Sequence, residues 1–430
     1  MDRRNFLFKA GYTIGAASVL PTIGNRLTKT ATLEKWDAVR ADFQLNTDKI
    51  QMAQFLLASH PSKVRKAIDT HRMGLDENTV EYLHHNEITK EEEVLEAAAK
   101  YLESSPDEIA LTDSTTMGLA ILYSGLKLKP GDDILTTTHD HYSTEKALEF
   151  AAERNGATIR QVVLYKNPAE TSKDEVLMNL KKAILPKTRI VAVTFVHSST
   201  GVKLPIKEMS AVIKEANKSR AESDRIFFCV DGVHGFGVEN ITVAELGCDF
   251  LAAGTHKWLF GPRGTGILWA KKDAWHMVNP IIPPFSIAYP MWMGVMPEEE
   301  LSFNSKITPG GFHSFEHRWA LKEAFEYHLE IGKKEIQNRT HALNTMMKEG
   351  MRNIKHVHLH TPLSNSLSSG INSFEVKGMD AEKVIQKLHK INIIGSTTPY
   401  KTIYARLTPC IINTEEEVKQ CIRALEKIND

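Results

Sequence analysis

Polar side chains that could do chemistry gather where five apolar, strand-like segments of the sequence end. Each segment is a nearly continuous apolar run, which is typical of a strand that is covered on both faces. In a sheet of parallel strands, ligands bind outside the carboxyl ends of the strands. We therefore expect one site to contain Ser114, Thr115, Thr116, His139, Asp140, His141, His197, Ser198, Ser199, Asp231, His234, Thr255, His256 and Lys257.

Lys257 and Asp231 give this group of residues a specific chemistry. A lysine amine can form a Schiff base with an aldehyde, and an aspartate after a buried strand can pair with a protonated pyridine nitrogen. Together they are the minimum equipment for pyridoxal 5'-phosphate, whose ring accepts electrons when a bond at an amino acid's Cα breaks. Lys257 can then move the Cα proton. Taken alone, Lys257 would more often be a solvated surface lysine, but glycines that permit close backbone approach follow it.

Two further stretches could hold such a cofactor. The sequence STT at 114–116 opens a helix, so its backbone N–H groups and hydroxyls could bind a phosphate dianion. Thr115 and Thr116 could also simply cap that helix. His141 could lie on one face of a planar ring, or it could be a packed core histidine.

Five motifs resemble, in the same order, those of the class V aminotransferase-fold enzymes, which include cysteine desulfurases and isopenicillin N epimerase. The likeness covers the chain from about residue 50 to its end, and the lysine motif is most similar to the epimerase-like branch. The motifs are STTMG (114–118), DHYS (140–143), DGVHGFG (231–237), THKWLFGPRGTGILW (255–269) and RLTPCIINTEEEV (406–418).

The resemblance implies roles for the residues around the cofactor ring. Lys257 would carry the cofactor, Asp231 would pair with the pyridine nitrogen, and His141 would stack on the ring. His234, where relatives often have Gln, would reach the phenolic oxygen of the ring. Ser198, which stands where desulfurases carry Asn, would contact the same oxygen.

The resemblance also assigns the residues that bind the cofactor's phosphate and the substrate's α-carboxylate. Thr115, Thr116 and His256 would hold the phosphate. Arg406 would bind the substrate's α-carboxylate with two parallel hydrogen bonds, although an arginine taken alone would more often form a structural ion pair. Relatives of this fold are dimers in which a neighbouring subunit's Thr often touches the phosphate. Phe312 stands at that position here, followed by His313 and Ser314, so we expect a homodimer and leave open which residue reaches across.

The sequence departs from the desulfurases at their nucleophile. These enzymes carry a cysteine shortly before the C-terminal arginine, whereas residues 392–406 contain none, and Cys410 lies after Arg406 in an apolar run. Persulfide chemistry needs a thiolate. We therefore expect an enzyme that acts at the Cα of an amino acid, of aminotransferase or epimerase type. A C–S lyase remains open, because β-elimination needs no cysteine, and a catalytically idle binding protein on this fold is a further alternative.

Histidine spacing offers a rival class, metal-dependent hydrolysis. His139 and His141 form an HxH pair, and HVHLH would place His356, His358 and His360 on one strand face. A metal site explains neither Lys257 nor the glycines after it, so we expect no metal.

The order of segments predicts how these residues are positioned. Apolar strands alternate with helical segments, which predicts an α/β fold with a mostly parallel sheet covered by helices on both sides, as in type I pyridoxal-phosphate enzymes. Thr89 and Glu92, spaced as a capping box, predict a helix over 89–103. We expect a large domain with its N-terminal segment at 31–310 and a smaller α+β domain at 311–430.

The first 30 residues have the layout of a twin-arginine export signal. Arg3 and Arg4 precede a mild apolar stretch, Ala10–Leu20, that is too short to span a bilayer. We expect a periplasmic protein without a membrane span in its mature form; a frayed basic N-terminus on a cytoplasmic protein is the alternative. Lysines and arginines equal the acidic residues at 53 each, so bulk charge gives no reason to expect nucleic acid as a partner.

Overall fold

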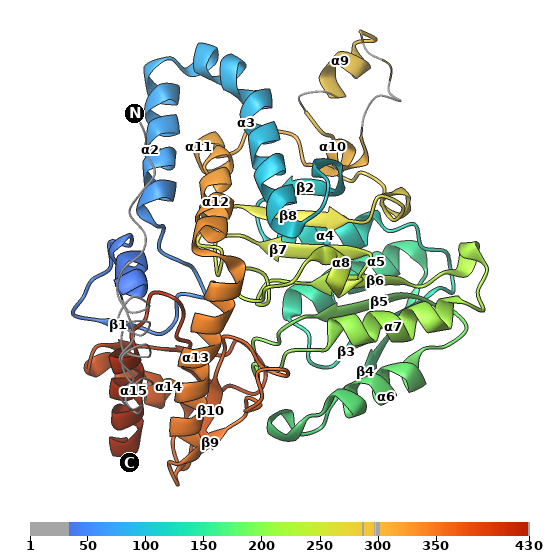
Figure 1. The fold of residues 1–430 in the computed structure, drawn as a ribbon. Coiled ribbons are helices and arrows are strands. Elements are labelled where there is room, and N and C mark those ends of the chain that lie inside the picture. Colours follow the sequence, from blue (N-terminus) through green and yellow to red (C-terminus); the bar gives the residue numbers. More distant parts are fainter. Residues whose placement is uncertain (1–33, 286–287, 296, 298–301, 429–430) are drawn as a thin grey trace, which may run out of the picture.

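A computed structural model of the chain describes residues 34–285, 288–295, 297 and 302–428 (Figure 1). The export signal predicted for residues 1–30 lies outside the described residues. Within the described residues, no helix combines the length and the apolar character that a membrane crossing requires.

A seven-stranded sheet forms the centre of the larger part of the molecule (Figure 1). Its strands are short, mostly buried runs rich in β-branched and aromatic residues, which favour pleated structure. In spatial order they are β2 (Ile109–Thr112), β8 (Gly266–Ala270), β7 (Phe250–Gly254), β6 (Phe227–Asp231), β5 (Thr188–Thr194), β3 (Asp133–Thr137) and β4 (Thr158–Val162).

The sheet is mostly parallel, which confirms the predicted fold class. Strands β3 to β7 pair in parallel, whereas β8 runs antiparallel to both of its neighbours, β7 and β2. A parallel pair needs a crossover of a dozen or more residues, usually a helix. The connection 255–265 contains no helix, so β8 runs back antiparallel beside β7. The turn that carries Lys257 therefore lies at the carboxyl end of β7.

Helices cover both faces of this sheet. One core joins α4 and α5 to one face through residues such as Leu119 and Leu148, and a second core joins α3, α7 and α12 to the other face through Val94, Met209 and Ala324. The helices that belong to this part are α2 (Ser62–Glu77), α3 (Thr79–Leu102), α4 (Thr115–Gly125), α5 (Tyr142–Asn155), α6 (Lys173–Ala183), α7 (Ile206–Asn217), α8 (Val243–Leu246), α9 (Ala288–Trp292), α10 (Phe303–Ile307), α11 (Phe315–Trp319) and α12 (Leu321–Ile331).

The predicted helix start at Thr89 is wrong. Helix α3 begins ten residues earlier, at Thr79, and Thr89 lies exposed on its surface. A threonine that faces water is tolerated inside a helix because its hydroxyl need not compete for buried backbone groups. The spacing of Thr89 and Glu92 therefore matched a capping box without forming one.

The C-terminal part is built on a small antiparallel sheet of order β12, β13, β10, β9. Leu343, Phe374, Leu388 and Cys421 belong to its own apolar core, so it packs as a separate unit beside the large sheet. This confirms the smaller α+β unit, while the boundary at residue 310 stays a prediction. Its elements are α13 (Lys333–Arg352), β9 (Val357–Leu359), β10 (Ser373–Val376), α14 (Ala381–Lys390), β11 (Ile393–Ile394), β12 (Ser396–Thr397), β13 (Ala405–Arg406) and α15 (Glu415–Lys427).

The N-terminal segment ties the two parts together. Strand β1 (Ile50–Gln51) pairs in parallel with β11 of the C-terminal part, and the backbone then passes the turn after β7, where Ala58 N donates to His256 O at 3.0 Å. This path places Phe55 between the two parts of the molecule, beside the residues that the sequence assigns to the site.

Candidate active site

A pocket opens where the parallel strands end and the C-terminal part meets the large sheet. Eight of the nine predicted site residues line it: Thr115, Thr116, His141, Ser198, Asp231, His234, Lys257 and Arg406. His256 does not line the pocket.

Lys257 lies in the turn that follows β7. Gly261 N closes the turn on Thr255 O at 2.9 Å, and a Cβ at position 261 would come within 2.9 Å of that same oxygen. Among the described residues, the Lys257 ammonium has neither a hydrogen bond nor an ion pair. Burial lowers the pKa of Lys257 below its usual range; the Asp231 charge opposes this shift and the Arg406 charge adds to it. A larger share of neutral, nucleophilic amine at neutral pH follows.

Asp231 is the last residue of β6 and is almost completely buried. Its Oδ1 accepts a hydrogen bond from Val233 N at 3.1 Å, and no described cation makes an ion pair with it. Burial raises the pKa of Asp231 to about 6, against that hydrogen bond and the Lys257 charge. A buried carboxylate that lacks a cationic partner fits a protonated pyridine nitrogen, because the added positive charge would favour its ionised form.

The start of α4 supplies the cradle predicted for a phosphate. Ser114, and not Thr115 or Thr116, is the cap of this helix, because its side chain accepts from Met117 N at 3.1 Å. Thr115 Oγ1 accepts from Gly254 N at 2.7 Å and so keeps its own proton to donate, and Thr116 is exposed to the pocket. A helix N-terminus with free hydroxyls is suited to an anion.

His256 lies beside this cradle, although it does not line the pocket. A Cβ at Gly254 would meet Thr115 Oγ1 at 2.9 Å and His256 Cε1 at 3.3 Å, so both side chains close around the bare end of β7. His256 Nδ1 makes a 3.0 Å hydrogen bond with Thr265 O, which fixes the ring. Its predicted contact with the phosphate stays a prediction.

His141 is held as the cap of α5. Its Nδ1 lies 3.3 Å from Ser143 N, which donates to it, and 2.8 Å from Ser143 Oγ. Burial, and then the charges of Lys257 and Arg406, lower the pKa of His141. The pocket therefore presents a neutral aromatic ring in a fixed orientation, as stacking on a planar ligand requires.

Arg406, on β13, is a buried cation without a carboxylate partner among the described residues. Its guanidinium donates to Ser198 O at 2.9 Å, to Thr397 O at 2.5 Å and to Ser396 Oγ at 3.2 Å, and it lies 4.7 Å from the centre of the Phe55 ring. Burial lowers the pKa of Arg406 to about 10. Nη1 and Nη2 each keep one unused N–H, which is the equipment for a carboxylate that enters the pocket.

Three aromatic side chains complete the site and were not predicted from the sequence. Trp258 donates a hydrogen bond to His234, Phe55 contacts both of them, and the Tyr400 hydroxyl lies 2.8 Å from Ser198 Oγ. Trp258 directly follows the lysine, so its place in that motif was the available signal. Phe55 and Tyr400 reach the site through tertiary contacts that no local pattern announces.

The four cysteines, Cys229, Cys248, Cys410 and Cys421, are free and buried, and none lines the pocket. Burial raises the pKa of every one of these thiols, to about 12 for Cys248 and Cys410. The segment 392–406 contributes Pro399 and Arg406 to the pocket instead of a thiol. The described residues thus offer no accessible thiolate for persulfide chemistry.

Histidines of the two clusters that suggested a metal site form contacts with other residues instead. His139 stacks on Tyr165 at 3.9 Å, His356 bonds Leu425 O at 2.9 Å, and His360 bonds Glu375 at 2.8 Å. Across the described parts of the chain, no group of three or more His, Cys, Asp or Glu side chains is placed to hold a metal ion.

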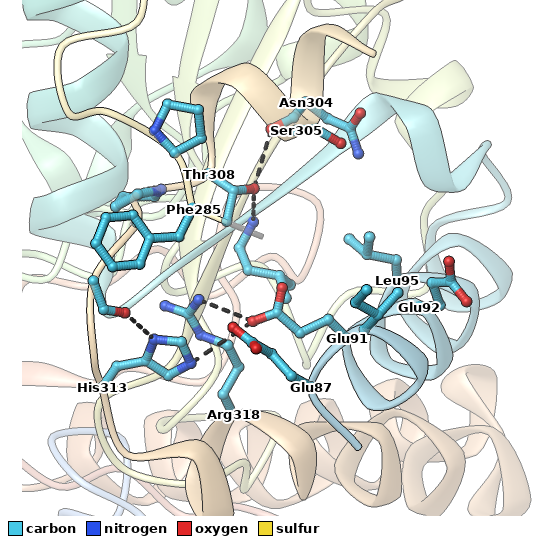
Figure 2. Close-up of a pocket in the computed structure, with 16 residues that line it drawn as sticks. Glu87, Glu91, Glu92, Leu95, Phe285, Asn304, Ser305, Thr308, His313 and Arg318 are labelled. Atoms are coloured by element: carbon cyan, nitrogen blue, oxygen red, sulfur yellow. Dashed lines mark hydrogen bonds and ion pairs between the residues drawn. The ribbon is translucent and has the colours of Figure 1, made fainter. Parts of the chain in front are cut away.

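A second pocket lies next to the phosphate cradle (Figure 2). Arg318 is buried there between Glu91, at 3.3 Å, and Asp113, at 3.2 Å, and Asp113 directly precedes the cap of α4. The wall opposite α3 is formed by residues of the segment 308–313; Phe312 belongs to this segment but does not line the pocket, and it is 83% accessible. The contact with a neighbouring subunit that the sequence resemblance implies for this segment stays a prediction.

Comparisons with known proteins agree with this geometry. The sequence model of the aminotransferase class-V family matches residues 58–420. The chain is 26% identical to a probable cysteine desulfurase of Xylella fastidiosa, over 92% of this chain and 96% of that protein. It is 25% identical to isopenicillin N epimerase of Streptomyces clavuligerus, over 77% of this chain and 83% of that protein.

Solved structures share the fold at low identity. A complex of the cystine C–S lyase C-DES with cysteine persulfide aligns with a TM-score of 0.79 at 22% identity, covering 89% of this chain and 99% of that chain. The cysteine desulfurase from Thermococcus onnurineus NA1 aligns with a TM-score of 0.77 at 21% identity, covering 91% and 97%. The chain belongs to the class V aminotransferase family and uses pyridoxal 5'-phosphate, for which Lys257, Asp231 and the start of α4 form a fitting site.

Proposed function

We propose that this enzyme acts at the Cα of an amino acid, as an aminotransferase or an epimerase. The observation that carries the proposal is the content of the pocket: an unpaired lysine, a buried aspartate and a buried arginine are present, and no thiol is. Pyridoxal 5'-phosphate supplies an electron-accepting ring when it is bound. The side chains of the protein bind the substrate and transfer the proton.

Arg406 binds the substrate, and Lys257 transfers the proton. The two unused N–H groups of Arg406 hold the substrate's carboxylate, and its bonds to Ser198 O and Thr397 O keep the guanidinium from turning. The amine of Lys257, with its lowered pKa, takes the Cα proton and returns it. Delivery of a proton to the opposite face of Cα, by a donor on that face, gives epimerisation, and delivery of the proton to another atom gives transamination.

A C–S lyase is the second candidate. The relatives at 26% identity that cover most of this chain are named as probable cysteine desulfurases, which break a C–S bond. β-Elimination from a sulfur-containing amino acid needs the cofactor and a base such as Lys257, and it needs no protein thiol. The pocket residues are therefore compatible with this outcome as well.

A panel of amino acids separates these candidates. The purified protein, loaded with the cofactor, is incubated with each amino acid in turn, and keto acid, ammonia, sulfide and optical rotation are measured. Keto acid formation that requires an amino-group acceptor indicates transamination, and loss of optical rotation without keto acid indicates epimerisation. Sulfide or ammonia release points to the lyase. No turnover of any amino acid by the loaded protein would refute all three and favour a binding protein.

We also propose that the working form is a homodimer in which the segment 308–314 faces the partner. Exposed aromatic and aliphatic side chains in this segment and in residues 285–295 support this proposal, because exposed apolar surface can mark an interaction site. They are Phe285, Tyr289, Trp292, Val295 and Phe312. Light scattering of the eluted protein measures the mass; a monomer at micromolar concentration would refute the proposal, and Phe312→Asp tests whether this face is the interface.

A further inference from the structure

We propose that Trp258 is a positioning residue that holds His234 in a single tautomer, with its proton on Nε2 and directed at an acceptor oxygen in the pocket. The inference deepens the proposed function and rests on it for the identity of that acceptor, the phenolic oxygen of the cofactor. The tautomer itself is a property of the chain alone.

The hydrogen bond between the two rings sets the tautomer. Trp258 Nε1 lies 3.2 Å from His234 Nδ1, and both residues are buried, at 3% and 5% exposure. An indole N–H can only donate. His234 Nδ1 must therefore present its lone pair, and in a neutral imidazole the one remaining proton belongs to Nε2.

The surroundings keep the imidazole neutral. Burial lowers the pKa of His234 far below its usual range, and the charges of Lys257, Arg406 and His141 add to that effect. Nε2 has no hydrogen-bond partner among the described residues, and the ring lines the pocket beside Lys257. The result is one unused N–H donor at the place where the cofactor must lie.

The indole is itself fixed on several sides. A Cβ at Gly370 would come within 2.4 Å of Trp258 Cη2, and a Cβ at Gly237 would come within 2.9 Å of Trp258 Cβ, so both glycines let the backbone close on the indole. The Phe55 ring lies 6.0 Å from Trp258 and 5.6 Å from His234 and covers the pair. Packing against Gly370 and the Phe55 ring thus restricts rotation of the indole and keeps its N–H directed at His234.

The hydrogen bond from Trp258 makes His234 Nε2 a donor only, which a histidine without such a partner is not. A free imidazole exchanges its proton between Nδ1 and Nε2 and can accept as well as donate. An N–H that only donates stabilises an oxygen that has lost its proton. With Trp258 in place, His234 therefore favours the deprotonated form of the oxygen that it meets.

Nuclear magnetic resonance of the protein without cofactor tests the tautomer directly. The imidazole nitrogens of His234, assigned by their loss in His234→Gln, should show a protonated Nε2 and an unprotonated Nδ1 across pH 6 to 8. In Trp258→Phe, which keeps the ring and removes the donor, the two nitrogen shifts should move toward each other as both tautomers become populated. Trp275→Phe is the matched control, since Trp275 is equally buried but its N–H has no partner and lies outside the pocket; His234 should not change in it.

The loaded protein supplies the second readout. Trp258→Phe should raise the pH midpoint of the cofactor's visible absorption change, whereas His234→Gln, whose amide still donates, should keep the midpoint near that of the wild type. A protonated Nδ1 in the wild-type protein, or unchanged nitrogen shifts in Trp258→Phe, would overturn the inference whether or not the cofactor binds. Failure of the cofactor to bind at all, with the predicted nitrogen shifts intact, would instead refute the proposed function.

Discussion

Removing the charge of Asp231 should make the cofactor-free protein more stable while it destroys the site. Burial raises the pKa of Asp231 from 3.8 to about 6, and each pKa unit corresponds to about 1.4 kcal/mol. Ionised Asp231 therefore costs the folded protein about 3 kcal/mol. Because the pKa of the folded state is the higher one, this penalty is absent below pH 4, grows to about half at pH 5 and is complete above about pH 6.

The assay is urea denaturation of cofactor-free wild type and Asp231→Asn between pH 5 and 8. The difference between the two proteins cancels other titrating groups, and the variant should gain about 1 to 2 kcal/mol in relative apparent stability across this range. Asp133→Asn is a control of opposite sign. Burial opposes ionisation of Asp133, but the hydrogen bonds from Arg160 and Thr188 outweigh it and lower its pKa, so this variant should be less stable than wild type by a nearly constant amount from pH 5 to 8, and the difference should shrink only at lower pH, where Asp133 becomes protonated.

Two results would refute this reasoning. One is a stability difference between Asp231→Asn and wild type that is flat with pH, because the carboxylate would then carry no penalty on ionisation. The other is full affinity of Asp231→Asn for pyridoxal 5'-phosphate, because the buried charge would then not serve the pyridine nitrogen. The penalty matters for function: a carboxylate that is unfavourable in the empty pocket gains most from a cationic partner.

Other substitutions test the remaining assignments. Lys257→Ala should leave cofactor that borohydride no longer fixes to the chain, as mass spectrometry would show; fixation at an unchanged level would place the attachment elsewhere. Arg406→Lys should raise KM about tenfold to a hundredfold through loss of a charge-assisted hydrogen bond, without moving the cofactor's absorption, and an unchanged KM would remove Arg406 from carboxylate binding. Cys410→Ala should leave turnover intact, whereas its abolition would mean that a thiol takes part. Lysines in place of Arg3 and Arg4 should retain the protein in the cytoplasm, and an unchanged periplasmic fraction would contradict the export signal.

The position of the site could be predicted because its causes are local. Strands such as β6 and β7 are apolar runs, and polar residues such as Asp231 stand at or just after their ends. Parallel strands bring those ends to one edge of the sheet. Lys257 and Thr115 follow from the same rule, since each lies three residues after the end of a strand, β7 and β2 respectively.

The supporting contacts could not be predicted because they join segments that are distant in the sequence. Phe55 reaches His234 only because β1 pairs with β11, some 340 residues later. The predicted helix cap at Thr89 was wrong for a related reason. Thr89 has the right spacing to cap a helix, but α3 packs against its neighbours and begins before Thr89, at Thr79. Tertiary packing overrides local propensity in both cases.

The segment 396–406 contains no thiol and connects the C-terminal part to the large sheet. Where desulfurases carry a nucleophile before the C-terminal arginine, this chain folds β12 and β13 together and uses the turn between them to bind the large sheet. Tyr400 meets Ser198 Oγ and Arg406 meets Ser198 O, so the turn anchors the loop after β5. Because this segment provides no nucleophile, the proposed reaction depends on Lys257 as its base. Epimerisation, transamination and β-elimination can all begin with that base, and they differ in which group then receives or supplies the proton and in whether a leaving group departs. The product of the amino-acid panel, more than any further contact in the pocket, decides among them.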